Sequence, residues 1–144
     1  MSTRCNVLIS DKYSKQWFYR HSDGYPSCTA ESLKTFIQWL VDGKIRDNVS
    51  QGASWLIILG NNECVEMSKE SNGEYHYGGG TEPILEGFSG WKVGSYEITT
   101  EKHGDIEWLY NIDMHKKTVK ISRPDGDEAK KYSYEEFLAE DFTE

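Results

Sequence analysis

Cysteine, long hydrophobic runs and positive charge are all scarce in this sequence. Its three cysteines (Cys5, Cys28 and Cys64) are odd in number and form no CxxC motif, which argues against a disulfide framework or a structural zinc site. The longest apolar run, WLIILG at residues 55–60, is far shorter than the about 20 residues that span a bilayer. Residues 1–15 hold no apolar segment of signal-peptide length. We therefore expect a cytoplasmic protein with no membrane partner.

Acidic residues outnumber basic ones, with 24 Asp and Glu against 16 Lys and Arg and a net charge of −8. Nucleic-acid binding depends on clustered positive charge, so we expect no generic binding to nucleic acid. A small anionic ligand stays open, because a few local Arg and His side chains can hold one against the global charge. A basic protein partner, mimicry of nucleic acid and simple solubility are the other interpretations of the acidity.

The spacing of apolar residues predicts one α+β domain over residues 1–144. Alternating apolar residues predict strands at 4–10, 16–21, 91–99, 106–113 and 118–124. Apolar stripes at helical spacing predict two helices, one through Leu33, Phe36, Ile37, Leu40 and Val41 and one through Val49, Ala53, Leu56 and Ile57. Hairpin connections imply a mostly antiparallel sheet of about five strands, with the two helices and a terminal helix at 133–142 on one face.

The segment 61–90 interrupts this pattern. Gly60-Asn61-Asn62 is expected to end the second helix, and the residues that follow are rich in Gly and Tyr. We predict an irregular insertion here, of a length that often carries function. Within it, Tyr77 precedes a Gly triplet at 78–80, which suits either a mobile aromatic lid over a base or sugar or a flexible linker.

Two segments share a His-x-Asp pattern. His21 and Asp23 lie in FYRHSDGYP (18–26), and His103 and Asp105 lie in KHGDIEWLY (102–110). On an extended chain, residues i and i+2 point to the same side, so each pair can present an imidazole and a carboxylate to one ligand. Two converging pairs would suit Zn²⁺, Mn²⁺ or Fe²⁺, or acid–base chemistry. Asp-Gly and Gly-Asp are also ordinary turn residues, so a purely structural role is the alternative.

Three further residues are candidates for ligand binding. Arg20 precedes His21 but is expected on the opposite face of its strand, and Tyr25 lies in the same loop. Arg46 lies before the second helix, whose N-terminus favours a phosphate or carboxylate; a salt bridge to a nearby Asp is the alternative. The sequence has no GxSxG, HExxH, Walker or GxGxxG pattern, so we predict no cofactor and do not favour covalent catalysis.

Several stretches together resemble a group of small phage and prophage proteins: MSTRCNV, YRHSDGYP, KIRDN and HGDIEWLYNID. The resemblance covers residues 1–60 and 91–122. It brings no catalytic residues with it. What it implies is a context, since small acidic phage proteins often counter host defence, some by binding a host nuclease complex and others by sequestering nucleotide second messengers.

These observations lead to three hypotheses. In the first, a phage-type counter-defence protein in the host cytoplasm sequesters a small anionic, nucleotide-like ligand without turnover. Its expected ligand-binding residues are Arg20, His21, Asp23, Tyr25, Arg46, Tyr77, His103 and Asp105. In the second, an acidic inhibitor binds a host nuclease or defence protein through residues 125–144 or 55–59. In the third, a metal-dependent phosphoesterase uses both His-x-Asp pairs. The sequence leaves enzymatic activity open but favours binding, and homo-oligomerisation is a further expectation.

Overall fold

A computed structural model describes residues 2–70 and 95–143 of the chain. The elements of this part are β1 (Cys5–Ser10), β2 (Lys15–Arg20), α1 (Pro26–Val41), α2 (Val49–Glu70), β3 (Glu97–Thr99), β4 (Trp108–Asp113), β5 (Thr118–Ser122), β6 (Lys130–Ser133) and α3 (Tyr134–Ala139). None of the helices described here is both long and apolar enough to cross a bilayer.

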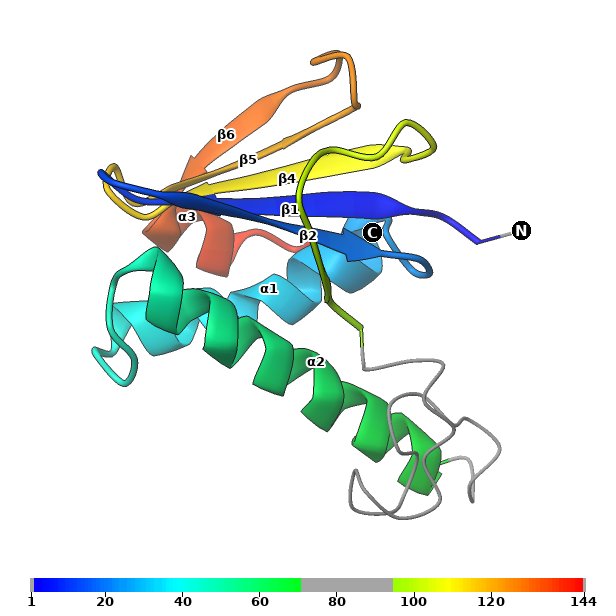
Figure 1. Cartoon of the computed structure of the whole chain (residues 1–144), viewed down its shortest axis with the longest axis horizontal. Coiled ribbons are helices and arrows are strands. Elements are labelled where there is room, and N and C mark those ends of the chain that lie inside the picture. Colours follow the sequence, from blue (N-terminus) through cyan, green and yellow to red (C-terminus); the bar gives the residue numbers. More distant parts are fainter. Residues whose placement is uncertain (1, 71–94, 144) are drawn as a thin grey trace.

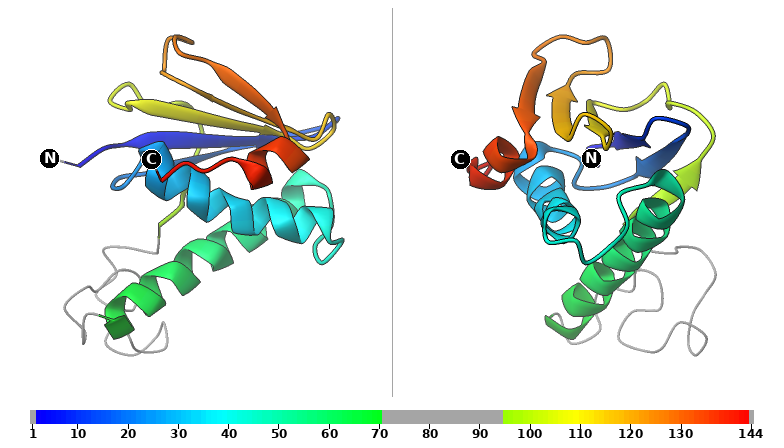
Figure 2. Two further views of the ribbon diagram at one scale, coloured as in Figure 1. Left: turned by 180° about the vertical axis from the view of Figure 1, so that it is seen from behind. Right: turned by 90° about the vertical axis from the view of Figure 1, so that its left-hand side faces the viewer.

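The six strands of the described chain form one sheet in the order β3-β2-β1-β4-β5-β6. The central pair β1 and β4 is parallel, and the other neighbouring pairs are antiparallel. Figure 1 shows α1, α2 and α3 on one face of this sheet, and Figure 2 shows α3 beside α1. The predicted α+β domain with a mostly antiparallel sheet is therefore confirmed, with one strand more than expected.

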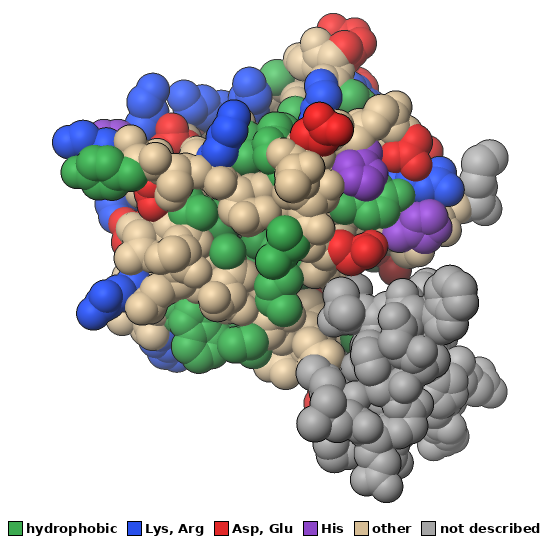
Figure 3. Space-filling view, viewed as in Figure 1, with side chains coloured by type: hydrophobic (Ala, Val, Ile, Leu, Met, Phe, Trp, Pro, Cys, Tyr) green, Lys and Arg blue, Asp and Glu red, His purple; other side chains and the backbone are tan. Residues whose placement is uncertain are grey.

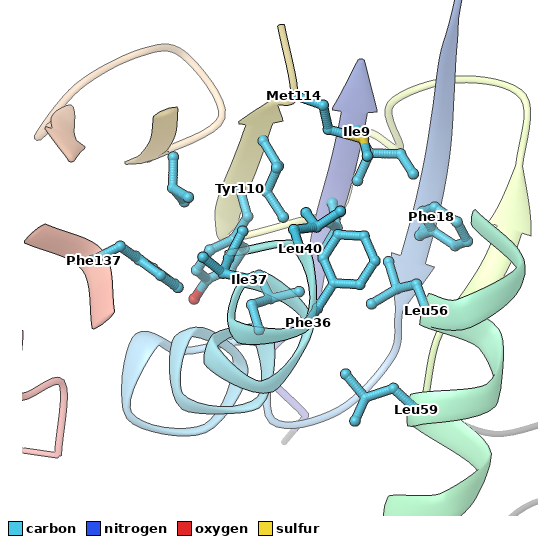
Figure 4. Packing of buried hydrophobic residues seen from close by; sticks show 14 of the residues in the cluster. Ile9, Phe18, Phe36, Ile37, Leu40, Leu56, Leu59, Tyr110, Met114 and Phe137 are labelled. Atoms are coloured by element: carbon cyan, nitrogen blue, oxygen red, sulfur yellow. The ribbon is translucent and has the colours of Figure 1, made fainter. Parts of the chain in front are cut away.

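The hydrophobic core lies between the sheet and the helices. Alternate residues of β1 point into it, because Cys5, Val7 and Ile9 are fully buried while Leu8 is only partly so. Figure 4 shows side chains of α1 and α2 packed against these strands. The main contributors from the other elements are Phe18, Leu33, Phe36, Ile37, Leu56, Leu59, Tyr110, Ile112 and Phe137. No helix of the described chain lies over the opposite face of the sheet.

Proline and glycine set the ends of α1. Pro26 occupies the first turn, where its missing N–H needs no partner, and Tyr25 is the N-cap residue without a side-chain cap. Gly43 follows the helix at φ 70, in the left-handed conformation that glycine adopts readily. The start of α2 is capped by Asn48, whose side-chain oxygen accepts the N–H of Gln51 at 2.9 Å.

Helix α2 does not end at Gly60 as the sequence predicted, but continues to Glu70. Gly60 is required there by a close approach: a Cβ at this position would lie 2.8 Å from Cδ2 of the buried Tyr96. Residues 61–70 of the expected insertion are thus helical. Residues 71–90, including Tyr77, lie outside the described residues.

Candidate functional site

Both His-x-Asp segments meet at Tyr19, on the sheet face away from the helices. The ring of His103 stacks on the ring of Tyr19, with centroids 4.1 Å apart and planes 18° apart. The ring centroid of His21 lies 6.0 Å from that of Tyr19, and its Nδ1 is 3.1 Å from the Tyr19 hydroxyl. One phenol thus joins two segments that are about 80 residues apart in the sequence.

The loop that carries His103 is held by hydrogen bonds to two strands. The backbone N–H of His103 donates to the side-chain oxygen of Asn6 at 2.8 Å, and Asn6 is fully buried in β1. The Nε2 atom of His103 lies 3.0 Å from the hydroxyl of Thr99, the last residue of β3. These contacts fix the imidazole plane over Tyr19.

The loop that carries His21 is pinned at Gly24. Its N–H donates to the carbonyl of Thr3 at 2.9 Å, and its carbonyl accepts the hydroxyl of Tyr110 at 2.6 Å. A Cβ on Gly24 would lie 2.9 Å from the carbonyl carbon of Arg4, so only glycine fits at this contact. The Asp-Gly pair of the loop therefore has the structural role expected of turn residues.

The two carboxylates do not orient the two imidazoles. Oδ2 of Asp105 lies 3.3 Å from Nε of Arg4. Asp23 has φ 60, and its carboxylate contacts the Tyr25 hydroxyl at 3.5 Å. The expected alignment of His and Asp requires an extended chain, but β2 ends at Arg20 and the second segment lies between β3 and β4.

Burial of Tyr19, reinforced by the charge of Asp105 and opposed by that of Arg4, raises the pKa of its phenol above the usual value. The phenol is therefore protonated at neutral pH and can donate to Nδ1 of His21. In a neutral imidazole this leaves the remaining proton on Nε2, and His21 is exposed to solvent. With the phenol as the donor to Nδ1, the exposed Nε2 edge of His21 can donate to an acceptor on a ligand.

The surface beside the His103 ring is hollowed. An open depression of about 580 Å³ lies over residues 99–105. Figure 3 shows histidine side chains on this face with acidic and basic side chains next to them. We call the group of Arg4, Tyr19, His21, Thr99, His103 and Asp105 the Tyr19 site.

Arg20 does not belong to this site. It points to the helix side of the sheet, as strand alternation predicted, and only 8% of it is exposed. Its Nε donates to the carbonyl of Ser22 at 3.3 Å, and its guanidinium lies 4.9 Å from the ring centroid of Tyr96. Arg20 supports the packing of the loop before α1 and is not placed to meet a ligand at Tyr19.

Arg46 lies at the opposite end of the sheet. It is exposed in the link between α1 and α2, near the β1–β2 turn, where Asp11 accepts the N–H of Val49 at 2.8 Å. The length of β1, about 17 Å at roughly 3.3 Å per residue, separates this end from the Tyr19 site. Asp23 and Tyr25 contact each other rather than Tyr19. Of the expected residues that the structure describes, which leave out Tyr77, only His21, His103 and Asp105 come together.

Three residues of the Tyr19 site were not expected from the sequence. Tyr19 shares its predicted strand face with His21, which was a usable signal. The sequence carries no comparable signal for Arg4 or Thr99, because their positions at the site depend on which strands are neighbours in the sheet. The buried Asn6 was a weaker hint, as a polar residue inside an apolar strand.

Neither metal binding nor nucleophilic catalysis is supported by these contacts. Within residues 2–70 and 95–143, no three His, Cys, Asp or Glu side chains are placed to hold a metal ion. The Thr99 hydroxyl lies 3.0 Å from Nε2 of His103, as a nucleophile would lie from its general base. In a catalytic triad a third side chain, usually a carboxylate, orients the base. In the described chain no carboxylate hydrogen-bonds to His103. Comparison of the chain with protein-family models, with curated proteins and with solved structures finds no match.

Proposed function

We propose that the protein binds a small anionic, nucleotide-like ligand at the Tyr19 site and holds it without turnover. The observation that supports this is the stacked pair of Tyr19 and His103 with His21 at its edge. One face of Tyr19 is covered by His103, and the half-buried His103 ring offers its outer face to a base. Stacking on an aromatic face contributes about 1–3 kcal/mol per base.

The anionic part of the ligand has donors nearby. The exposed imidazole edge of His21 and the guanidinium of Arg4 both lie around Tyr19. In this structure, Arg4 pairs with the carboxylate of Asp105, whose side chain is 56% exposed. An incoming phosphate can therefore replace Asp105 as the partner of Arg4, because a guanidinium binds phosphate and carboxylate with the same geometry.

Capture is favoured over catalysis by the same contacts. The phenol of Tyr19 is protonated, and within residues 2–70 and 95–143 no carboxylate hydrogen-bonds to either imidazole to orient it. A protein that only sequesters its ligand needs complementarity and no activated nucleophile. The resemblance to small phage proteins supplies the context: removal of a nucleotide signal of host immunity would counter that defence.

Isothermal titration calorimetry with cyclic dinucleotides and ADP-ribose derivatives tests the proposal. We expect binding to at least one of them and about a 10-fold or larger loss of affinity in His103→Ala, from the stacking term. His115→Ala is the matched control, since His115 is exposed in the turn after β4. Chromatography of the recovered ligand should show it unchanged. No heat with any ligand, or equal losses in both variants, would overturn the proposal.

A further inference from the structure

A groove of about 270 Å³ lies between β4, β5 and β6 and the segment after α3. This is on the helix side of the sheet, so the groove and the Tyr19 site are on different faces. Three aromatic side chains from separate elements line it: Trp108 of β4, Tyr132 of β6 and Phe142 beyond α3. The ring of Tyr132 meets that of Phe142 at 81°, with centroids 5.6 Å apart. Perpendicular rings around a hollow form the walls of a cation-binding cage.

Two of these rings already attract cations of the chain itself. The guanidinium of Arg123 lies 3.9 Å from the ring centroid of Trp108, and Nζ of Lys34 lies 5.3 Å from that of Phe142. Both distances are within the range of about 6 Å in which a ring face stabilises a cation. Two of the rings around the groove therefore already lie against cations of the chain itself, which is the chemistry that a further cation would meet there.

Carboxylates near the groove also favour a cation. Residues 125–144 contain eight acids and two lysines, a net of −6 out of the chain's −8. Glu128, Glu140 and Asp141 reach the groove. Glu128 is already paired with Arg123 at 2.7 Å, but the Glu140 carboxylate makes no ion pair or hydrogen bond within the described chain. Lys130 is the one cationic side chain that lines the groove among the described residues.

We propose that this groove binds a lysine or arginine side chain presented by a basic segment of a partner protein. The aromatic rings receive the cation and its methylene stem, and Glu140 and Asp141 neutralise its charge. The groove, at about 270 Å³, lies just below the roughly 300 Å³ at which pockets for drug-sized molecules begin, so it has room for one long side chain. The proposal is independent of ligand binding at the Tyr19 site.

Calorimetry of the full chain with three peptide amides tests the chemistry of the occupant: hexa-arginine, hexa-lysine and hexa-citrulline. Citrulline has the shape of arginine without its charge. We expect binding of the two cationic peptides at physiological salt and at least 10-fold weaker binding of the citrulline peptide. Failure of both cationic peptides to bind, or equal binding of hexa-citrulline, would overturn the proposal.

Two double variants of equal charge locate the binding. E140Q/D141N and E101Q/E135Q each change the net charge from −8 to −6, but only the first pair lines the groove. We expect the first to weaken hexa-arginine binding about 10-fold and the second less than about 3-fold. Equal losses would show that the peptide responds only to net charge, which would overturn the assignment to this groove.

Lys130→Met supplies a test in the opposite direction. Removing the resident ammonium while keeping a long apolar stem should raise the affinity for hexa-arginine several-fold, because a competing cation is gone. Thermal unfolding of each variant should match the parent, which separates lost binding from lost folding. A lower affinity of correctly folded Lys130→Met would contradict a cation-selective groove.

Discussion

The backbone N–H of His103 donates to the side-chain oxygen of Asn6 over 2.8 Å. Asn6 is itself fully buried, and its Nδ2 donates to the carbonyl of Phe18 at 2.7 Å. A single amide side chain thus ties β1, β2 and the loop after β3 together. The position of the stacked imidazole depends on this residue, although the Asn6 side chain is directed to the backbone of the loop and not to the ring.

Asn6→Ala is therefore expected to loosen the Tyr19 site. The N–H of His103 would lose its partner, and a buried polar group left without one costs about 1–3 kcal/mol. Hydrogen exchange should show faster exchange of the His103 amide, and urea unfolding a lower free energy of unfolding. Asn111→Ala is the control, because Asn111 lies on the same sheet face in β4 and its side chain makes no hydrogen bond within the described chain. An unchanged exchange rate in Asn6→Ala would contradict this role.

Only one side of the apolar run in α2 is buried in the core. Leu56 is fully buried, whereas Ile58 is 42% exposed. Leu56→Ala should lower the free energy of unfolding by about 2–5 kcal/mol, from lost burial and the cavity that remains. Ile58→Ala should lower it by less than about 1 kcal/mol. Urea denaturation measures both, and similar losses in the two variants would mean that Ile58 is covered in solution, as by a second copy of the chain.

The central elements were predictable because their patterns are local and strong. Cys5, Val7 and Ile9 alternate along β1, and Leu33, Phe36, Ile37 and Leu40 form one helical stripe. Strand β6 (Lys130–Ser133) was not predicted, since no strand was expected between 118–124 and the terminal helix at 133–142. It is a short edge strand with Tyr132 as its single large apolar residue, so it has no alternation to detect and depends on pairing with β5.

The site was predictable only in part, for reasons of topology. The repeated His-x-Asp pattern pointed to two segments that do meet. Which side chains meet there depends on β1 lying between β2 and β4, and this arrangement places Asn6 under His103. The pairing of each His with its own Asp was not realised. Asp23 adopts φ 60 and contacts the Tyr25 hydroxyl, and Asp105 pairs with Arg4. Such long-range and backbone effects have no local signature.

At Gly60, the higher helix propensity of alanine and the close packing against Tyr96 have opposite effects on stability. In an exposed helix, Gly→Ala stabilises by about 1 kcal/mol. At Gly60 the new Cβ would lie 2.8 Å from Cδ2 of Tyr96 and 3.1 Å from its backbone nitrogen. Overpacking typically costs about 1–3 kcal/mol, and the backbone atom cannot simply rotate away, so Gly60→Ala should be destabilising. Gly104→Ala is the control, because apart from its chain neighbours no atom of the described residues lies within 4 Å of the place its methyl group would take. This variant should be close to neutral in thermal unfolding. A more stable Gly60→Ala would show that α2 moves freely relative to Tyr96.

Glu63 makes stability depend on pH through burial. Burial raises the pKa of its carboxyl above the usual value, while a hydrogen bond from Ser32 and the charge of Arg20 oppose that shift. A raised pKa in the folded state means that the protonated form favours folding. This contribution is fully present below the unfolded pKa near 4.5 and is lost as pH rises through the folded pKa.

Glu63→Gln tests this dependence. It keeps an acceptor for the Ser32 hydroxyl, which lies 2.8 Å from Oε1 of Glu63, and it removes the buried charge. Urea unfolding should therefore show the variant more stable than the parent at pH 7.5, with the difference shrinking towards pH 4, whereas the exposed Glu101→Gln should show no such trend. A variant that is less stable at pH 7.5 would mean that the attraction between Glu63 and Arg20 outweighs the burial of the carboxylate.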